Sequence, residues 1–271
     1  MPVAFTRITD LLWVHQWLDH AVERVCWALL LGDVESAEAW RQHLDAVLRW
    51  HLHGENRVLL PEYVARVTSP PPFGAADIIY DEHCRFEVAL DGLWSGVTEP
   101  VGALRRVRAL AGALEHHDAR EAQSLKPLLE PCLSPRETRE VLDAMTVGWP
   151  ASLDALPTEP VATEVVPIAA HPALATDFAG WIVQLQSAVV ARDDAQALRT
   201  LAAFDATLAA AEASLPPADA RLREGQRRKV CALVEDVADL LTRSADLTAR
   251  VRAFDRLETL RRLWSNVVRG P

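Results

Sequence analysis

Cysteine is scarce in this chain of 271 residues, and its four cysteines lie far apart at Cys26, Cys84, Cys132 and Cys231. No CxxC pair occurs, so the spacing indicates neither a disulfide framework nor a zinc knuckle. The sequence also lacks an apolar run long enough to span a bilayer, and it does not open on a basic segment followed by an apolar one. We therefore expect a reduced, cytoplasmic protein without a membrane partner.

Positive charge is in deficit as well. The chain carries 28 Lys and Arg residues against 38 Asp and Glu residues, which gives a formal net charge of -10. Phosphate backbones and anionic lipid headgroups repel such a protein at long range. The charge therefore argues against nucleic acid as a partner.

Glycine is also scarce, with 11 residues, whereas half of the chain is apolar. Alanine, leucine, arginine and glutamate are abundant, and this composition favours helices over sheet. The length exceeds that of a single typical domain. We expect an all-α protein with two helical parts.

One pattern, His-x3-Glu-x3-Leu-x-Pro, occurs twice, beginning at His51 and at His117. In a helix, residues four apart lie one above the other on the same face, so His51 and Glu55 point at a common position, as do His117 and Glu121. An imidazole nitrogen and a carboxylate oxygen at one position form part of a metal site. Each copy therefore predicts half of a metal site.

A further histidine precedes each copy, in another stretch with helical periodicity. His20 lies 31 residues before His51, and His83 lies 34 residues before His117. Two such helix pairs would form a four-helix bundle with four histidines and two glutamates near its axis. Helix bundles build metal sites in this way.

At these positions the chain resembles the hemerythrin-like, or HHE cation-binding, domains, whose signature is His … His-x3-Glu … His … His-x3-Glu. The resemblance covers about residues 7–131. It implies that Glu55 and Glu121 bridge two iron ions, and that the remaining ligands are His20, His51, His83 and His117. Zinc and manganese are the alternative metals, because nitrogen and oxygen ligands suit all three.

The pattern differs from that of the invertebrate oxygen carriers, which have a second histidine where this chain has Glu87 and a His-x4-Asp pattern on the fourth helix. It resembles instead the HHE proteins associated with oxygen or nitric oxide sensing, iron handling and repair of iron–sulfur centres. The resemblance implies a non-haem diiron protein that binds O2, another diatomic molecule or peroxide, for sensing, carriage or detoxification.

Three other functions fit the same residues. A diiron oxidase or oxygenase, an oxidoreductase acting on a small molecule, would need a substrate cavity beside the metal. A protein of iron storage, delivery or iron–sulfur repair would hold its metal loosely. A metal-free interaction protein would tolerate replacement of His51 or Glu55.

Several further side chains lie near the predicted ligands in the sequence. His15 and His43 could orient a ligand by hydrogen bonding. Glu23 and Glu87 could add a carboxylate, and the Tyr80 phenol could donate a hydrogen bond, although surface or core positions explain all three. Two more histidines point away from the ligand positions and are expected to be exposed: His53 and His116.

Periodicity predicts four helices in a metal-binding domain of residues 1–147, at about residues 6–31, 34–67, 75–95 and 99–129. Ser134 and Glu137 have the spacing of a capping box, with a proline between them at the first helical position. They predict a short fifth helix that ends near Met145 and closes the bundle at one end.

Residues 148–172 are rich in proline and predict an extended linker. Beyond them, residues 173–271 contain four more amphipathic stretches, at about 173–192, 195–215, 218–243 and 245–268. They predict a second helical bundle, which lacks the His-x3-Glu pattern. It could be a degenerate copy of the first bundle, a homodimerisation element or a module that binds a protein partner.

Overall fold

The computed structural model describes residues 5–93, 100–150, 157, 159–160, 178–213, 220–243 and 245–269. Its regular structure is helical throughout these residues and includes no strand there, which confirms the predicted all-α class. The chain forms two compact units, built mainly from residues 1–161 and 162–271. Most of the expected linker, 148–172, lies outside the described residues, so that segment remains a prediction.

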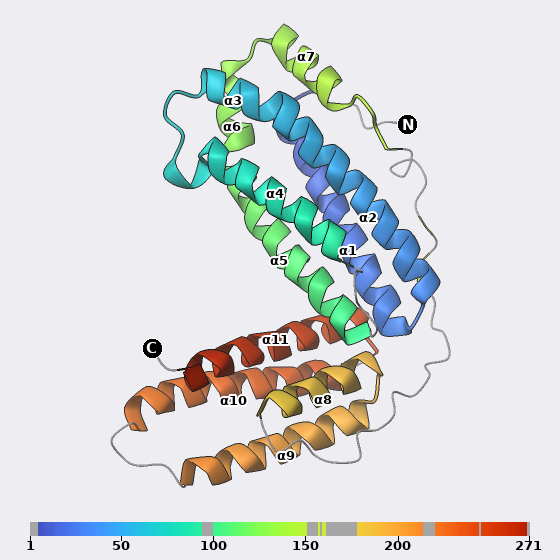
Figure 1. Cartoon of the computed structure of the whole chain (residues 1–271), viewed down its shortest axis with the longest axis vertical. Helices are drawn as coiled ribbons and strands as arrows, with labels where there is room; N and C mark the ends of the chain where they lie inside the picture. The colour runs from blue at the N-terminus through green and yellow to red at the C-terminus, as the bar shows by residue number, and fades with distance from the viewer. Residues whose placement is uncertain are drawn as a thin grey trace. The chain divides into compact units, whose positions relative to one another are not determined.

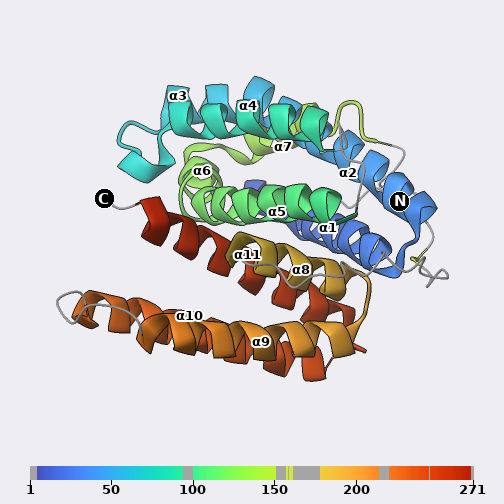
Figure 2. The ribbon, with the colours of Figure 1, turned by 60° about the horizontal axis from the view of Figure 1, so that its bottom comes forward.

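The first unit contains long helices that lie side by side (Figures 1 and 2). The first helical segment consists of η1 (Ile8–Leu11) and α1 (Leu12–Leu31), and the second of α2 (Val34–Gly54), η2 (Glu55–Leu59) and α3 (Leu60–Arg66). After η3 (Pro72–Gly74), the third is α4 (Ala76–Gly92). The fourth consists of α5 (Pro100–Gln123) and α6 (Leu125–Leu129), and it is followed by η4 (Glu130–Cys132) and α7 (Pro135–Met145).

The first helical hairpin turns at Gly32, as the sequence predicts. Gly32 has a φ of 72°, a left-handed conformation that glycine adopts without steric cost and that commonly ends a helix. Asp33 then caps α2, because its side chain accepts a hydrogen bond from the backbone N–H of Ser36 at 3.0 Å. These two residues set the start of α2.

The short helix α7 closes one end of the bundle, which confirms the prediction from the capping box. The Ser134 hydroxyl accepts from the Glu137 backbone N–H at 3.3 Å, and the Glu137 carboxylate accepts from the Ser134 backbone N–H at 2.8 Å. The apolar face of α7 belongs to a core cluster with residues of η1, η2, α3, α4 and α6, whose buried members are Ile8, Leu11, Leu59, Leu60, Tyr63, Ile79, Leu125, Leu129, Val141, Leu142 and Met145. Each large apolar side chain buried here stabilises the fold by about 1.5–3 kcal/mol.

The second and fourth helical segments are each interrupted just after the glutamate of the repeated pattern, a feature that periodicity did not predict. In η2 the backbone N–H of Leu60 bonds to the carbonyl of Glu55, five residues back, so this turn is π-helical. In the other copy Ser124 leaves the helical conformation, with φ of -133° and ψ of -75°. Both copies contain proline, Pro61 and Pro127, which lacks an N–H and disfavours regular helix around the residue four positions before it.

The second unit is a helical bundle, as predicted, with described helices α8 (Phe178–Val190), α9 (Asp194–Ala213), α10 (Ala220–Thr242) and α11 (Leu247–Arg269). Its buried apolar residues include Trp181, Ile182, Leu185, Val189, Phe204, Val237, Phe254, Leu257 and Leu260. Among the helices described in either unit, none is long and apolar enough to cross a membrane. A role of residues 173–271 in dimerisation or partner binding remains a prediction.

Candidate metal centre

Glu55 and Glu121, the two glutamates of the repeated pattern, lie at the centre of the first unit with no solvent exposure. A carboxylate removed from water loses much favourable hydration free energy, so it needs a cation or hydrogen-bond donors nearby. Histidines from several helices surround the two carboxylates. Together they form two groups of potential metal ligands that share both glutamates.

The first group, here called the His83 half-site, consists of Glu55, His83, His117 and Glu121. Their ligand atoms all lie within 4.8 Å of one another. His83 Nε2 is 3.5 Å from Glu55 Oε2, and His117 Nε2 is 3.4 Å from Glu121 Oε1. Two imidazoles and two carboxylates therefore converge on one position.

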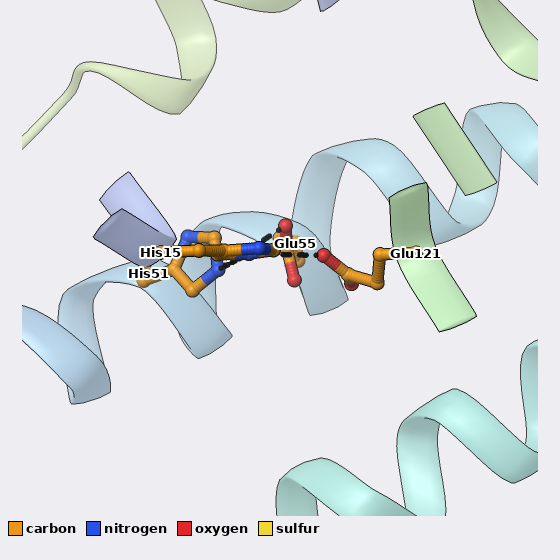
Figure 3. A group of neighbouring side chains, drawn as sticks. All are labelled: His15, His51, Glu55 and Glu121. Carbon is orange, nitrogen blue, oxygen red and sulfur yellow. Dashed lines mark hydrogen bonds and ion pairs between the residues drawn. The ribbon is translucent and has the colours of Figure 1, made fainter. Parts of the chain in front are cut away.

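The second group, here called the His15 half-site, consists of His15, His51, Glu55 and Glu121, and Figure 3 shows both imidazoles directed toward the two carboxylates. His15 Nε2 is 3.2 Å from Glu121 Oε2, and His51 Nε2 is 3.4 Å from Glu55 Oε1. Each glutamate thus presents one oxygen to each half-site. This is the arrangement expected of carboxylates that bridge two cations.

The structure brings together five of the six ligands predicted from the sequence, namely His51, Glu55, His83, His117 and Glu121. It does not bring His20 to them. The ring of His20 lies edge-on to Trp40, with centroids 5.6 Å apart, and accepts a hydrogen bond from Arg24 Nε at 3.3 Å. His15 stands in the group instead, because five residues along an α-helix correspond to a rotation of about 140°.

Two features of the sequence favour His15 over His20 as the ligand of the first helical segment. His15 lies four residues after Leu11 and three before Leu18, within the buried stripe of the first helical segment. It also precedes His51 by 36 residues, which is closer to the 34-residue spacing of His83 and His117 than the 31 residues from His20. Burial periodicity was therefore a better guide than the nearest upstream histidine.

Hydrogen bonds fix the rings of His83 and His117. His83 Nδ1 donates to Asn56 Oδ1 at 2.6 Å, and His117 Nδ1 donates to Glu82 Oε2 at 3.1 Å. Arg120 in turn holds the Glu82 carboxylate through Nη2 at 3.0 Å. A proton on Nδ1 leaves the lone pair of Nε2 directed at the glutamates, which is the tautomer that binds a metal ion.

A lysine lies within the site, and the sequence prediction missed it. The Lys126 side chain has no solvent exposure, and its ammonium is 2.9 Å from Glu55 Oε1 and also bonds to Glu121 Oε2. Lys126 is the variable residue of Leu-x-Pro in the second copy, and the first copy has Leu60 at that position. The signal in the sequence was a charged lysine at a position where the other copy of the pattern has an apolar leucine.

Burial and neighbouring charges shift the pKa values of these groups strongly. Burial, followed by the negative charge of Glu121, raises the pKa of Glu55 to about 8. Burial lowers the pKa of the Lys126 ammonium, but the charges of Glu121 and Glu55 outweigh this effect and the net shift is upward. Burial lowers the pKa values of His15 and His83 to about 4, so both rings are neutral at pH 7, the form that coordinates metals.

The remaining candidates from the sequence lie away from the two groups. The ring of His43 packs between Trp17 and Trp40, with centroids at 4.6 and 5.6 Å. The side chains of Glu87 and Tyr80 are exposed, and Glu23 belongs to neither half-site. The two histidines expected on the surface, His53 and His116, are exposed as predicted.

Comparison with protein families agrees with this site. The model of the hemerythrin HHE cation-binding domain matches residues 6–129. These residues are a hemerythrin HHE domain. The matched range ends with α6 and includes every member of both half-sites as well as Lys126. Searches of curated proteins and of solved structures found no match to the chain.

A groove of about 540 Å³ lies between α4 and α5 on the surface of the HHE domain. Its lining includes Glu82, Phe86, Leu110 and His116. The Phe86 ring contacts the ring of His117 edge-on, with centroids 5.2 Å apart. One side chain therefore separates this groove from a potential metal ligand.

Proposed function

We propose that the HHE domain holds a dinuclear iron centre that binds O2 or another small molecule such as nitric oxide or peroxide. The observation that carries this proposal is the pair of half-sites that share Glu55 and Glu121, with two histidines completing each. The proposed ligands are His15, His51, Glu55, His83, His117 and Glu121.

The donor atoms fit a metal cation. Among the described residues, Glu55 Oε2, Glu121 Oε1, His83 Nε2 and His117 Nε2 are buried without a hydrogen-bond partner. Buried polar atoms are almost always paired, so four unpaired atoms that converge on one position support the proposal that a cation binds there. Imidazole and carboxylate donors suit iron, manganese or zinc. Iron is favoured by the two shared carboxylates and by the HHE family resemblance, and manganese and zinc are the alternatives.

Bound iron would supply the electrons for chemistry with oxygen. The chain supplies the surroundings of the metal: Asn56 and Glu82 orient two of the imidazoles, and the buried position of all six ligands limits the access of water. Sensing, carriage and detoxification would share the first step, which is binding of the small molecule at the metal.

The groove beside Phe86 favours a second function, a diiron oxidase or oxygenase that acts on a small organic molecule. Such an enzyme needs a space for substrate near the metal, and this groove lies one side chain from His117. Apolar lining from Phe86 and Leu110 suits a largely apolar substrate.

One experiment tests the proposal and separates the two functions. Full-length protein is loaded with Fe(II) without oxygen, and its absorption spectrum is followed on mixing with air and then under vacuum. A spectral change that reverses under vacuum supports reversible binding. An irreversible change to the ferric form shows that oxygen is reduced and favours the oxidase. A protein that retains no iron after loading and gel filtration contradicts both.

A further inference from the structure

The two half-sites have the same ligand types but differ in how their atoms are bonded. In the His83 half-site, the four ligand atoms have no hydrogen-bond partner among the described residues. In the His15 half-site, the Lys126 ammonium bonds to one oxygen of each carboxylate, Glu55 Oε1 and Glu121 Oε2. The ammonium also lies 3.3 Å from His15 Nε2. A positive charge therefore already occupies the position between the ligands of the His15 half-site.

The histidines of the two half-sites also differ in their hydrogen bonds, and this difference too favours metal binding at the His83 half-site. His83 and His117 each have a hydrogen bond at Nδ1 that leaves Nε2 available. In the other half-site, His15 Nε2 and His51 Nε2 are only 2.9 Å apart and form a hydrogen bond, so one of these nitrogens carries a proton. That nitrogen cannot bind a metal until this hydrogen bond breaks. The His83 half-site is thus arranged for a metal ion, whereas the His15 half-site is not.

The cause of the difference lies in the repeated pattern. Leu60 and Lys126 hold the same position in the two copies, and both are buried. A leucine at both positions would leave the two carboxylates without a protein cation and the half-sites nearly equivalent. Lys126 follows the helix break at Ser124, and the new helix α6 carries its side chain to the two carboxylates.

We propose that Lys126 is a competing cation within the proposed metal centre, so that the two metal ions bind unequally. The first ion binds in the His83 half-site, and the second binds in the His15 half-site only after displacing the ammonium. The inference rests on the proposed function. We expect the second ion to bind roughly tenfold or more weakly, because at the effective dielectric constant of about 20 that applies within proteins, repulsion between unit charges at about 4 Å exceeds the free energy of a tenfold change.

The first test is a metal titration of full-length protein stripped with a chelator. Anaerobic Fe(II) is added, and bound iron is followed by calorimetry and by metal analysis after gel filtration. The wild type should bind one ion tightly and the second much more weakly. Lys126→Leu, which copies the first repeat, and Lys126→Met should bind two ions with similar affinity. Two equal steps in the wild type, or unchanged unequal steps in both variants, would overturn the inference.

Substitution of Lys126 leaves two buried carboxylates without their cation, so circular dichroism must show that each variant is folded. A second test keeps Lys126 and compares His51→Ala with His117→Ala, which alter the same position of the two copies. His51→Ala should retain the tight ion, whereas His117→Ala should weaken its binding by roughly tenfold or more. An equal loss of affinity for the tight ion in the two variants would contradict the inference. A wild-type protein that binds no iron would instead contradict the proposed function.

Discussion

Glu82 Oε2 accepts a hydrogen bond from His117 Nδ1 at 3.1 Å, which joins α4 to α5 beside the proposed metal centre. The bond orients the imidazole, and the negative charge of Glu82 makes the ring a better donor to a metal ion. Glu82→Gln should therefore weaken metal binding by roughly 10–100-fold. A chelator competition assay measures the effect. Glu87→Gln, at an exposed position on the same helix, is the control and should leave the affinity unchanged.

The ligand assignment predicts a loss of metal without a loss of fold. His117→Ala and Glu121→Ala should each remove most of the bound iron, because each deletes a donor from the His83 half-site. Helical content measured by circular dichroism should largely survive. His116→Ala is the matched control, since that neighbouring side chain is exposed and should not affect iron content. Full retention of iron in both ligand variants would refute the assignment.

Much of this site could be predicted from the sequence because each repeated ligand pair lies within one helix, where i, i+4 geometry is fixed locally. His51 and Glu55, for example, required no knowledge of tertiary structure. The choice between His15 and His20 depended on which face of α1 is buried, and the position of Lys126 depended on the helix break at Ser124. The apolar stripe of α1 favoured His15, whereas packing between helices sets the position of Lys126, which local periodicity does not describe.

In the fold as well, features set by local geometry could be predicted from the sequence, whereas features set by tertiary packing could not. Gly32 ends a helix at the predicted position because its left-handed conformation is a local property. The capping box of Ser134 and Glu137 likewise depends only on residues three apart. By contrast, the π-helical turn at Glu55 was not predicted, because proline interrupts a helix in several ways and tertiary packing selects among them.

The groove between α4 and α5 gives a prediction about access to the metal. Phe86 separates this groove from His117, so Phe86→Ala should open a path for small anions. Azide should then bind the iron-loaded variant faster than the wild type, as measured by stopped-flow absorption. Val88→Ala provides the control, because Val88 is an exposed residue of the same helix. An unchanged azide rate in Phe86→Ala would show that ligands enter by another route.

Acid should weaken the end of the bundle that α7 closes. Hydrogen bonds from Ser134, with a further contribution from Arg66, lower the pKa of Glu137 to about 2. A lowered folded-state pKa stabilises the protein above the ordinary glutamate pKa, and this stability is lost as the pH falls toward 2. In urea unfolding of chelator-treated protein, Glu137→Gln should lose less stability than the wild type between pH 4.5 and 2. Glu140→Gln on the same helix should follow the wild type.

Gly74 lies against the helix break that precedes Lys126. A Cβ at Gly74 would lie 2.4 Å from the Cβ of Ser124, so Gly74→Ala forces these segments apart. We expect a loss of about 1–3 kcal/mol, typical of overpacking, measured by urea unfolding. Gly112→Ala is the control with opposite sign. Its added Cβ meets nothing within 4 Å, and alanine in a helix interior is about 0.5–1 kcal/mol more favourable than glycine.

Displacement of Ser124 should also move Lys126, because α6 begins at the next residue. In the metal titration of chelator-stripped protein, Gly74→Ala should therefore show a smaller difference between the affinities of the first and second ions than the wild type. Gly112→Ala should keep the wild-type difference. If Gly74→Ala loses stability but retains the wild-type ratio of affinities, the Lys126 position does not depend on the contact between η3 and the break in the fourth helical segment.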